Sequence, residues 1–226
     1  MRIILAGATG LVGAQVVGLL CQSPNVSSIV AIGRRPPALA HPKLQACTGP
    51  VAQWPSLIEG LGGDVAISTL GTTIGDAGSQ QAFFALDHDA LLAFARAVCA
   101  GGVGHFLMVS SVGAHAASRN FYLATKGKAE ASVDQIGFQR LDILRPGLLR
   151  GKRAGRLRLG ERAAIALSPV TDMLTPAVLA RYRSIAAADV AAALVQLSGA
   201  SESGSFIHHN EEMRALSAAA SHPKRT

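Results

Sequence analysis

Short, uninterrupted runs of apolar residues alternate along the chain with segments of helical periodicity. The apolar runs predict buried β-strands at Ile3–Ala6, Ile29–Ile32, Leu44–Cys47, Val65–Leu70, Phe106–Val109 and Leu141–Leu144. Helical spacing predicts helices at Leu11–Cys21, between Ser79 and Gly101, and at Ala187–Leu197. Because parallel strands need crossover connections, this alternation predicts an α/β fold with a doubly wound parallel sheet and helices on both faces.

The composition favours one folded domain. With 226 residues, of which 49% are hydrophobic and 15% charged, the chain can build a core, and intrinsic disorder is excluded. We expect a single domain over residues 1–226, with a small substrate-facing region at about 146–185 and a frayed tail at about 217–226. The uncharged stretch from Ile3 to Gly33 is interrupted by glycines and polar residues, so no membrane span is expected.

The three cysteines are widely spaced and form no C-x-x-C pair, so neither a disulfide framework nor a metal site is indicated. Unpaired cysteines suit a reducing compartment, and we assign the protein to the cytoplasm.

A glycine-rich loop follows the first predicted strand. The sequence Gly7-Ala8-Thr9-Gly10-Leu11-Val12-Gly13 stands between that strand and the first helix. Glycines allow a tight turn and a close approach of the backbone to a pyrophosphate, and the helix amino end attracts a phosphate. We therefore expect a dinucleotide cofactor here, held by Gly7, Thr9, Gly10, Leu11, Val12 and Gly13.

The end of the second strand indicates which dinucleotide. Arg34 and Arg35 stand where a site that prefers NAD would carry an acidic residue. Guanidinium groups suit the 2′-phosphate of NADP, so the predicted cofactor is NADP(H). A solvated basic pair is the alternative interpretation.

A tyrosine and a lysine follow the fifth strand. Tyr122 and Lys126 are four residues apart in a predicted helix and therefore share a face. A free phenol, with a pKa near ~10, is a poor base, but a neighbouring ammonium favours its ionised form. Tyr122 is thus a candidate acid/base, and a serine at the strand end could orient the substrate oxygen.

Together these motifs resemble the short-chain dehydrogenase/reductase superfamily, in its atypical branch similar to the Tat-interacting-protein oxidoreductases. The matching segments occur in the family's order over the first two-thirds of the chain: Gly7–Gly13, Gly33–Arg35, Ser68–Thr73, Phe106–Ser111, Tyr122–Lys126 and Leu144–Gly147. The resemblance implies a Rossmann-type fold and an oxidoreductase that acts on a small carbonyl or alcohol substrate.

The resemblance also implies roles for individual residues. Leu70, Gly71, Thr72 and Thr73 would line the cofactor, Tyr122 and Lys126 would contact the cofactor too, and Pro146, Gly147 and Leu148 would border the nicotinamide. The implied catalytic residues are Ser111, Tyr122 and Lys126, with Ser110 as the alternative serine.

The chain departs from the family at two points. Asp87 stands where many relatives have asparagine, and it falls on an apolar stripe, where a carboxylate is either structurally paired or directed to a site. Thr48–Pro50 offers no acidic residue for an adenine ring.

A basic segment, 145–162, carries seven of the 21 lysines and arginines. It could bind an anionic substrate, the cofactor phosphates, an acidic protein or nucleic acid, or be a solvated face. Nucleic acid is disfavoured because no aromatic residues interleave the arginines.

Two other functions stay open: an NADPH-binding redox sensor and a sugar-nucleotide epimerase, although the region after the sixth strand is short for a nucleotide-sugar domain. The sequence does not distinguish a monomer from a homodimer.

Overall fold

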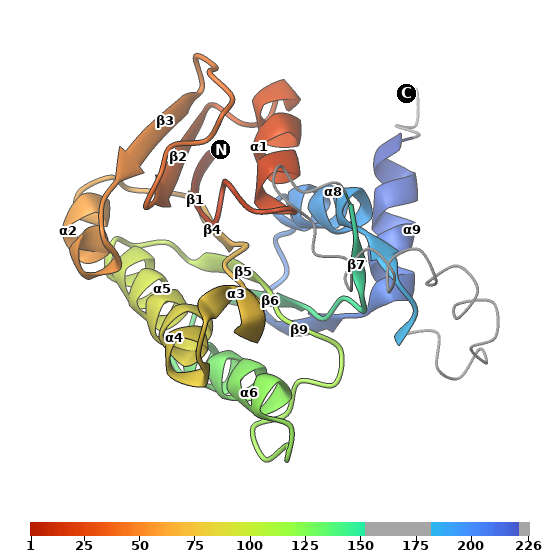
Figure 1. The fold of residues 1–226 in the computed structure, drawn as a ribbon. Coiled ribbons are helices and arrows are strands. Elements are labelled where there is room, and N and C mark those ends of the chain that lie inside the picture. Colours follow the sequence, from red (N-terminus) through yellow and green to blue (C-terminus); the bar gives the residue numbers. More distant parts are fainter. Residues whose placement is uncertain (152–181, 222–226) are drawn as a thin grey trace.

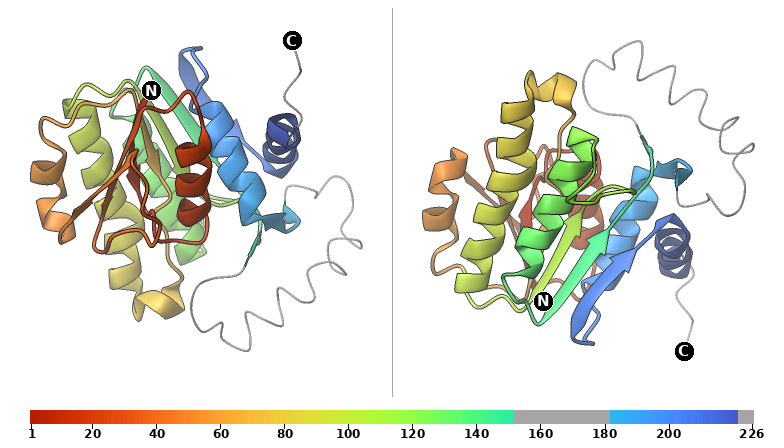
Figure 2. Two further views of the ribbon diagram at one scale, coloured as in Figure 1. Left: turned by 90° about the horizontal axis from the view of Figure 1, so that it is seen from above. Right: turned by 90° about the horizontal axis from the view of Figure 1, so that it is seen from below.

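In the computed structural model, which describes residues 1–151 and 182–221, a parallel β-sheet lies between two layers of helices (Figures 1 and 2). Its strands are β1 (Arg2–Ala6), β2 (Ser28–Gly33), β3 (Leu44–Thr48), β4 (Val65–Ser68), β5 (His105–Val109), β6 (Arg140–Leu144) and β9 (Gly204–His208). Two further strands, β7 (Leu149–Arg150) and β8 (Ile185–Ala186), form a separate parallel pair.

The helices cover both faces of the sheet. They are α1 (Gly13–Gln22), the short η1 (Val51–Gln53), α2 (Trp54–Ile58), α3 (Ile74–Ala77), α4 (Gln80–Phe84), the π-turn η2 (Ala85–Ala90), α5 (Leu91–Ala100), α6 (Phe121–Asp134), α8 (Ala187–Leu197) and α9 (Asn210–Ser221).

The strand order is β3-β2-β1-β4-β5-β6-β9, and every neighbouring pair is parallel. The chain first adds strands on one side of β1 and then, from β4 onward, on the other. Such a reversal creates a crevice at the carboxyl ends of β1 and β4, where ligands bind in open α/β sheets. The predicted Rossmann-type fold is confirmed.

Two apolar cores fix the helices to the sheet. On one face, α1 and α8 pack on alternate residues of the strands, with side chains such as Val16, Leu20 and Leu194 fully buried. On the other face, α2, α5 and α6 do the same through Trp54, Phe94 and other buried residues. Because the strands are buried on both sides, they read in the sequence as continuous apolar runs rather than as alternating patterns.

The carboxyl-terminal region differs from the expected frayed tail at 217–226. Residues 217–221 belong to α9, whose Met213 is buried in the core beside α8. Ser217 also donates a hydrogen bond to Asp189 of α8 at 3.0 Å. This packing and this bond order the segment; residues 222–226 lie outside the described part of the chain.

A buried polar cluster crosses the sheet beneath α9. Asp142 of β6 accepts hydrogen bonds from His105 and His208 at 2.7 Å each and from Arg140 at 2.7 and 2.9 Å. The other ring nitrogen of His208 lies 2.7 Å from Glu212. Burial by itself would raise the pKa of Asp142, but these donors outweigh it and hold the pKa well below its usual range.

His208 faces a carboxylate on each ring nitrogen, so both nitrogens are donors and the ring is charged. Burial alone would lower the pKa of His208, but bonding to Asp142 and Glu212 raises it above its ordinary value. Because folding raises the pKa of His208, protonation of its ring stabilises the fold. This stabilisation is fully present below about pH 6.5, the pKa of histidine in the unfolded chain, and is lost as the pH rises through the pKa of the folded protein. The Asp142 contribution is present above about pH 4 and is lost at lower pH.

We therefore expect His208→Gln to destabilise the protein most near about pH 5.5 and progressively less toward about pH 9. The free energy of unfolding in urea, measured for both proteins across this range, tests the expectation. His115→Gln, which changes an exposed histidine, is the control and should show no such trend. An equal effect of His208→Gln at both ends of the range would show that folding does not raise the pKa of His208.

Candidate functional site

The glycine loop after β1 has the backbone shape that its sequence predicts. Gly7 has φ of +88°, a conformation that residues with a side chain rarely adopt, and its carbonyl accepts a hydrogen bond from the Gly10 N–H at 2.9 Å. A Cβ added to Gly7 would lie 2.6 Å from Thr69 Oγ1, and one added to Gly13 would overlap the Gly7 carbonyl. The first helix can approach the sheet this closely because these positions are glycine.

The amino end of α1 therefore opens directly onto the crevice. No side chain caps this end of the helix, and its first turn carries no acidic residue. Backbone N–H groups and the positive end of the helix dipole are thus available to a phosphate.

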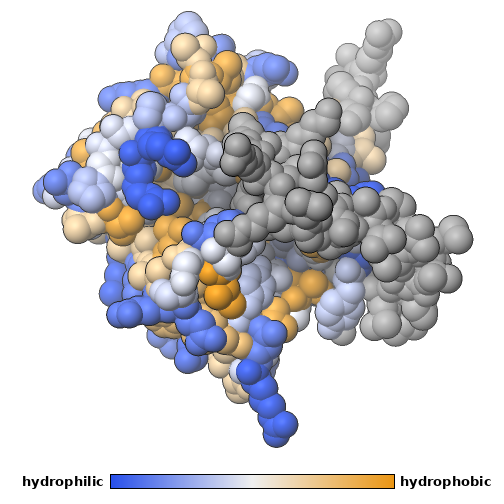
Figure 3. All heavy atoms as spheres, in the orientation of Figure 1, coloured by the Kyte–Doolittle hydropathy of each residue, from blue (hydrophilic) through white to orange (hydrophobic). Residues whose placement is uncertain are grey.

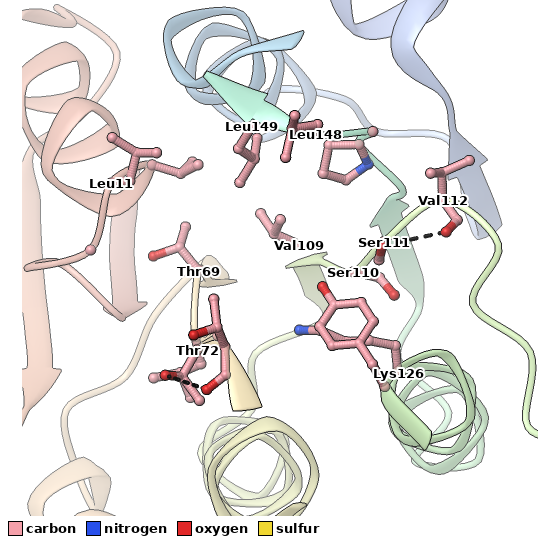
Figure 4. Close-up of a pocket in the computed structure, with 18 of the residues that line it drawn as sticks. Leu11, Thr69, Thr72, Val109, Ser110, Ser111, Val112, Lys126, Leu148 and Leu149 are labelled. Atoms are coloured by element: carbon pink, nitrogen blue, oxygen red, sulfur yellow. Dashed lines mark hydrogen bonds between the residues drawn. The ribbon is translucent and has the colours of Figure 1, made fainter. Parts of the chain in front are cut away.

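Two adjoining cavities lie along the carboxyl edge of the sheet. The larger has a volume of about 530 Å³ and the smaller about 110 Å³, and both contact Gly10, Thr69, Leu70 and Gly71. Figure 4 shows Leu11, Thr69, Thr72, Val109, Lys126 and Leu148 arranged around the larger space.

Most of the residues that the sequence predicted come together here. The larger cavity contacts Gly10, Leu11, Val12, Leu70, Gly71, Thr72, Thr73, Ser110, Ser111, Tyr122, Lys126, Pro146, Gly147 and Leu148. The smaller contacts Gly7, Thr9, Gly10, Arg34, Arg35, Leu70 and Gly71. Of the predicted residues only Gly13 lines neither cavity, and its place is in the packing of α1 on the loop.

Other wall residues were missed by sequence reasoning. The larger cavity also contacts Thr69, Val109, Val112, Leu149 and Gly151, and the smaller contacts Ala8, Ala31, Ile32, Gly33, Trp54, Thr69 and Leu86. Thr69 follows β4 directly, so its position at a strand end was a usable signal. Trp54 and Leu86 lie in helices far along the chain from the glycine loop, and no local pattern marks them.

Helix α6 presents a polar face to the larger cavity. Tyr122 and Lys126 both line it, and Glu130 follows one turn later on the same face. The helix begins cleanly at Asn120, whose side chain accepts a hydrogen bond from the Leu123 N–H at 3.1 Å. The ring of Tyr122 packs against the buried Phe83 with a centroid distance of 5.4 Å, which holds the phenol in place.

Lys126 is buried and paired. Its Nζ lies 2.6 Å from Asp87 Oδ1, and Asp87 Oδ2 accepts a hydrogen bond from the Thr72 N–H at 3.0 Å. Asp87 is 1% exposed. Of the two interpretations that the sequence left open for this carboxylate, the structure shows the paired one. Asp87 lines neither cavity, but its partners Lys126 and Thr72 line the larger one.

The two serines after β5 have different environments. Ser110 is buried and donates a short hydrogen bond to Glu130, which also binds Arg145 through contacts of 3.0 and 2.5 Å. Ser111 Oγ has one long contact, 3.4 Å to the Val112 carbonyl (Figure 4). The hydroxyl of Ser110 is therefore engaged by Glu130, although Ser110 lines the larger cavity, whereas that of Ser111 is the freer of the two.

The segment after β6 supplies the opposite wall. The Gly147 N–H donates to Asn210 Oδ1 at 3.0 Å, and Asn210, the first residue of α9, in turn donates to the Arg183 carbonyl at 2.6 Å. Leu148 lines the cavity and is 47% exposed. On the face of the molecule drawn in Figure 3, hydrophobic residues are interspersed with hydrophilic ones.

The predicted substrate-facing region, 146–185, and the basic segment, 145–162, lie largely outside the described residues. Within the described part, Arg145 is bound to Glu130 and does not line either cavity. It is therefore not available to an anionic substrate. Lys152, Arg153, Arg156, Arg158 and Arg162 fall in the part of the chain that the structure leaves undescribed.

The residues present fit a dinucleotide. Glycines stand at the two positions where a Cβ would fill the loop, and the uncapped amino end of α1 faces the shared edge of the cavities. The smaller cavity, at the end of β2, is lined by Arg34 and Arg35, both exposed, and by no carboxylate among the residues described.

Comparison with known proteins agrees with this geometry. A family model described as NAD(P)H-binding matches residues 7–199. The chain belongs to this NAD(P)H-binding family. Its relatives include the protein named FMP52, mitochondrial, of Coccidioides immitis, 35% identical over 218 residues that cover 88% of both chains. The protein of the same name from Candida albicans is 36% identical over 169 residues, covering 73% of this chain and 74% of the relative.

Several solved structures have the same fold as the present chain. The Bordetella bronchiseptica enzyme WbmH, in complex with NAD⁺, has a TM-score of 0.70 at 16% identity, covering 96% of this chain and 79% of that one. A UDP-glucose 4-epimerase from Thermotoga maritima has a TM-score of 0.67 at 12% identity, covering 100% and 84%. At these identities the likeness establishes the Rossmann-type fold alone.

One expectation is contradicted. The relatives are named as mitochondrial proteins, which overturns the cytoplasmic assignment. Unpaired cysteines indicate reducing surroundings but do not tell the cytoplasm from an organelle. No helix among the described residues is long and apolar enough to cross a bilayer.

Proposed function

We propose that the protein is an NADP(H)-dependent oxidoreductase of the short-chain dehydrogenase/reductase type, acting on the carbonyl or hydroxyl group of a small molecule. The observation that supports this most is that Tyr122 and Lys126 line the same cavity as the glycine loop. The narrower likeness to the Tat-interacting-protein oxidoreductases is part of the proposal. When bound, NADP(H) supplies or accepts a hydride.

Three residues of the chain have separate roles in the proposed reaction. Tyr122 donates a proton to the substrate oxygen during reduction and removes it during oxidation. Lys126, which lines the same cavity as Tyr122, bonds the nicotinamide ribose. Ser111 orients the substrate oxygen, and its weakly engaged hydroxyl supports this choice over Ser110, which is bound to Glu130.

The cofactor extends, in this proposal, across both cavities. Gly7, Thr9, Gly10, Leu11 and Val12 hold the pyrophosphate, and Leu70 to Thr73 support the adjacent ribose. Pro146, Gly147 and Leu148 border the nicotinamide. Arg34 and Arg35 bind the 2′-phosphate, which explains why no carboxylate is needed there for a ribose hydroxyl.

Cofactor preference tests the proposal. We expect NADPH to bind more tightly than NADH in parallel titrations. Arg34→Ala/Arg35→Ala should weaken NADPH binding by about 10- to 100-fold, because hydrogen bonds between charged groups contribute about 1.5–3 kcal/mol. NADH binding should change little.

Arg96→Ala, which removes an exposed arginine from α5, is the control for loss of positive charge. Equal affinities for the two cofactors in the unmodified protein, or a preference for NADH, would refute the assignment of NADP(H).

A further inference from the structure

A buried carboxylate adjoins the active site and has no part in the proton transfer proposed above. Asp87 lies in the π-turn η2, between α4 and α5, and uses its two oxygens for two different partners. Oδ1 lies 2.6 Å from the ammonium of Lys126, and Oδ2 accepts the Thr72 N–H at 3.0 Å. Lys126 belongs to α6, whereas Thr72 belongs to the loop after β4 that lines the larger cavity.

We propose that Asp87 is a positioning residue that fastens the active-site lysine to the cofactor-binding loop. The inference rests on the proposed function, because it assigns Asp87 a role through Lys126 and through Thr72. A lysine has a flexible four-carbon stem, so a fixed partner is needed to hold its ammonium at one point. Asp87 supplies that partner from a third element.

The loop passes in direct contact with the pair. A Cβ added to Gly71 would lie 3.5 Å from Lys126 Nζ and 3.6 Å from Asp87 Oδ1. Gly71 lines both cavities, so a shift of the pair would move a wall that the cofactor shares. Binding of the cofactor and placement of the lysine are thereby coupled through one carboxylate.

The π-turn is itself fixed to α6 at a second point. His88, which follows Asp87, places Nε2 3.1 Å from Ser132 Oγ on α6, and its ring stacks on Phe84 at 4.5 Å. The contact between His88 and Ser132 therefore fixes the position of Asp87 relative to α6 independently of its ion pair with Lys126. Short π-helical turns within helices are often found at functional sites, where they redirect a side chain.

The chemistry explains why a carboxylate suits this position better than an asparagine would. A carboxylate has two accepting oxygens, and Asp87 uses one for an ammonium and the other for an N–H. An amide has one accepting oxygen and would turn a donating NH₂ toward one of these donors. Glu130, the carboxylate one turn after Lys126 on α6, is bound to Ser110 and Arg145 and cannot substitute for Asp87.

Asp87→Asn tests the proposal, because it keeps the size of the side chain and removes one acceptor. The matched control is Asp89→Asn, an exposed carboxylate two residues further along the same turn, whose 2.8 Å contact with His88 Nδ1 an asparagine oxygen can keep. NADPH affinity can be measured by quenching of Trp54, the single tryptophan of the chain, which lines the smaller cavity. Turnover is measured at saturating NADPH.

We expect Asp87→Asn to weaken NADPH binding and to lower kcat by about 10- to 100-fold, the effect of a small misplacement of a reacting group. The KM for the carbonyl substrate should change by less than about threefold, since neither Asp87 nor Thr72 is proposed to bind that substrate. Asp89→Asn should resemble the unmodified protein in all three quantities. Equal behaviour of the two variants would overturn the proposal.

Melting temperatures test the pairing of Asp87 with Lys126 without any measurement of turnover. Lys126→Met leaves the Asp87 carboxylate buried without its counter-charge, whereas Asp87→Asn/Lys126→Met removes both charges. We expect the double variant to melt at a higher temperature than Lys126→Met. A lower or equal melting temperature would show that the two residues are not paired and would overturn the proposal.

These two measurements also separate failure of this inference from failure of the proposed function. A protein that binds NADPH but turns over no substrate would refute the oxidoreductase assignment. The order of melting temperatures and the NADPH affinities of Asp87→Asn and Asp89→Asn would still decide the role of Asp87.

Discussion

Tyr122→Phe is expected to bind NADPH within about twofold of the unmodified protein and to lose about 10²- to 10⁴-fold in turnover, the usual contribution of a general acid or base. The substitution removes the hydroxyl and retains the ring that packs on Phe83 at 5.4 Å, so the cavity keeps its shape. Lys126 and the glycine loop are untouched. Steady-state oxidation of NADPH with an aldehyde or ketone substrate provides the measurement.

Tyr182→Phe provides the control for this experiment. The chain has two tyrosines, and Tyr182 does not line the larger cavity. Loss of the Tyr182 hydroxyl should reduce turnover far less than loss of the Tyr122 hydroxyl. Undiminished turnover in Tyr122→Phe would exclude the phenol as the proton donor.

Gly13→Ala is expected to remove NADPH binding and to destabilise the fold. The added methyl group would overlap the Gly7 carbonyl and lie 2.5 Å from Thr69 Oγ1, so α1 would have to move away from β1. Overpacking of this kind costs about 1–3 kcal/mol of stability. Displacing two N–H groups from a phosphate, at about 1.5–3 kcal/mol each, corresponds to about 100-fold or more in affinity.

Gly18→Ala, in the same helix, is the matched control. A Cβ at Gly18 would have no neighbour within 4 Å, and alanine favours a helix over glycine by about 0.5–1 kcal/mol. NADPH affinity should be retained and the free energy of unfolding in urea should rise slightly. If Gly13→Ala behaved like Gly18→Ala, the glycine loop would not have the close packing described for it.

The central strands could be predicted because each is buried on both faces and therefore forms an uninterrupted apolar run. Strand β9 escaped notice because it lies at the edge of the sheet, and four of its five residues are exposed or half-buried. Helix α9 was missed for a related reason. Its fully buried residues include the apolar Met213 and the polar Asn210, and polar contacts such as Ser217 to Asp189 also hold it, so few apolar residues mark its inner face.

The predicted site residues were found from motifs that lie at strand ends, where a parallel sheet brings them to one edge. The partners of those residues were not predictable, because they come from distant segments. Nothing local in the sequence indicates that Asp87 meets Lys126, or that Glu130 engages both Ser110 and Arg145. These pairs depend on how α6 packs against the π-turn and the sheet, which only the three-dimensional structure reveals.

Oxidation of NADPH in the presence of the unmodified protein, measured with a panel of aldehydes, ketones and quinones, tests the central claim most directly. We expect many molecules of NADPH to be consumed per molecule of protein with at least one substrate, and more slowly when NADH replaces NADPH. Tight binding of NADPH with no turnover of any carbonyl in the panel would contradict the claim and favour a redox-sensing or regulatory protein.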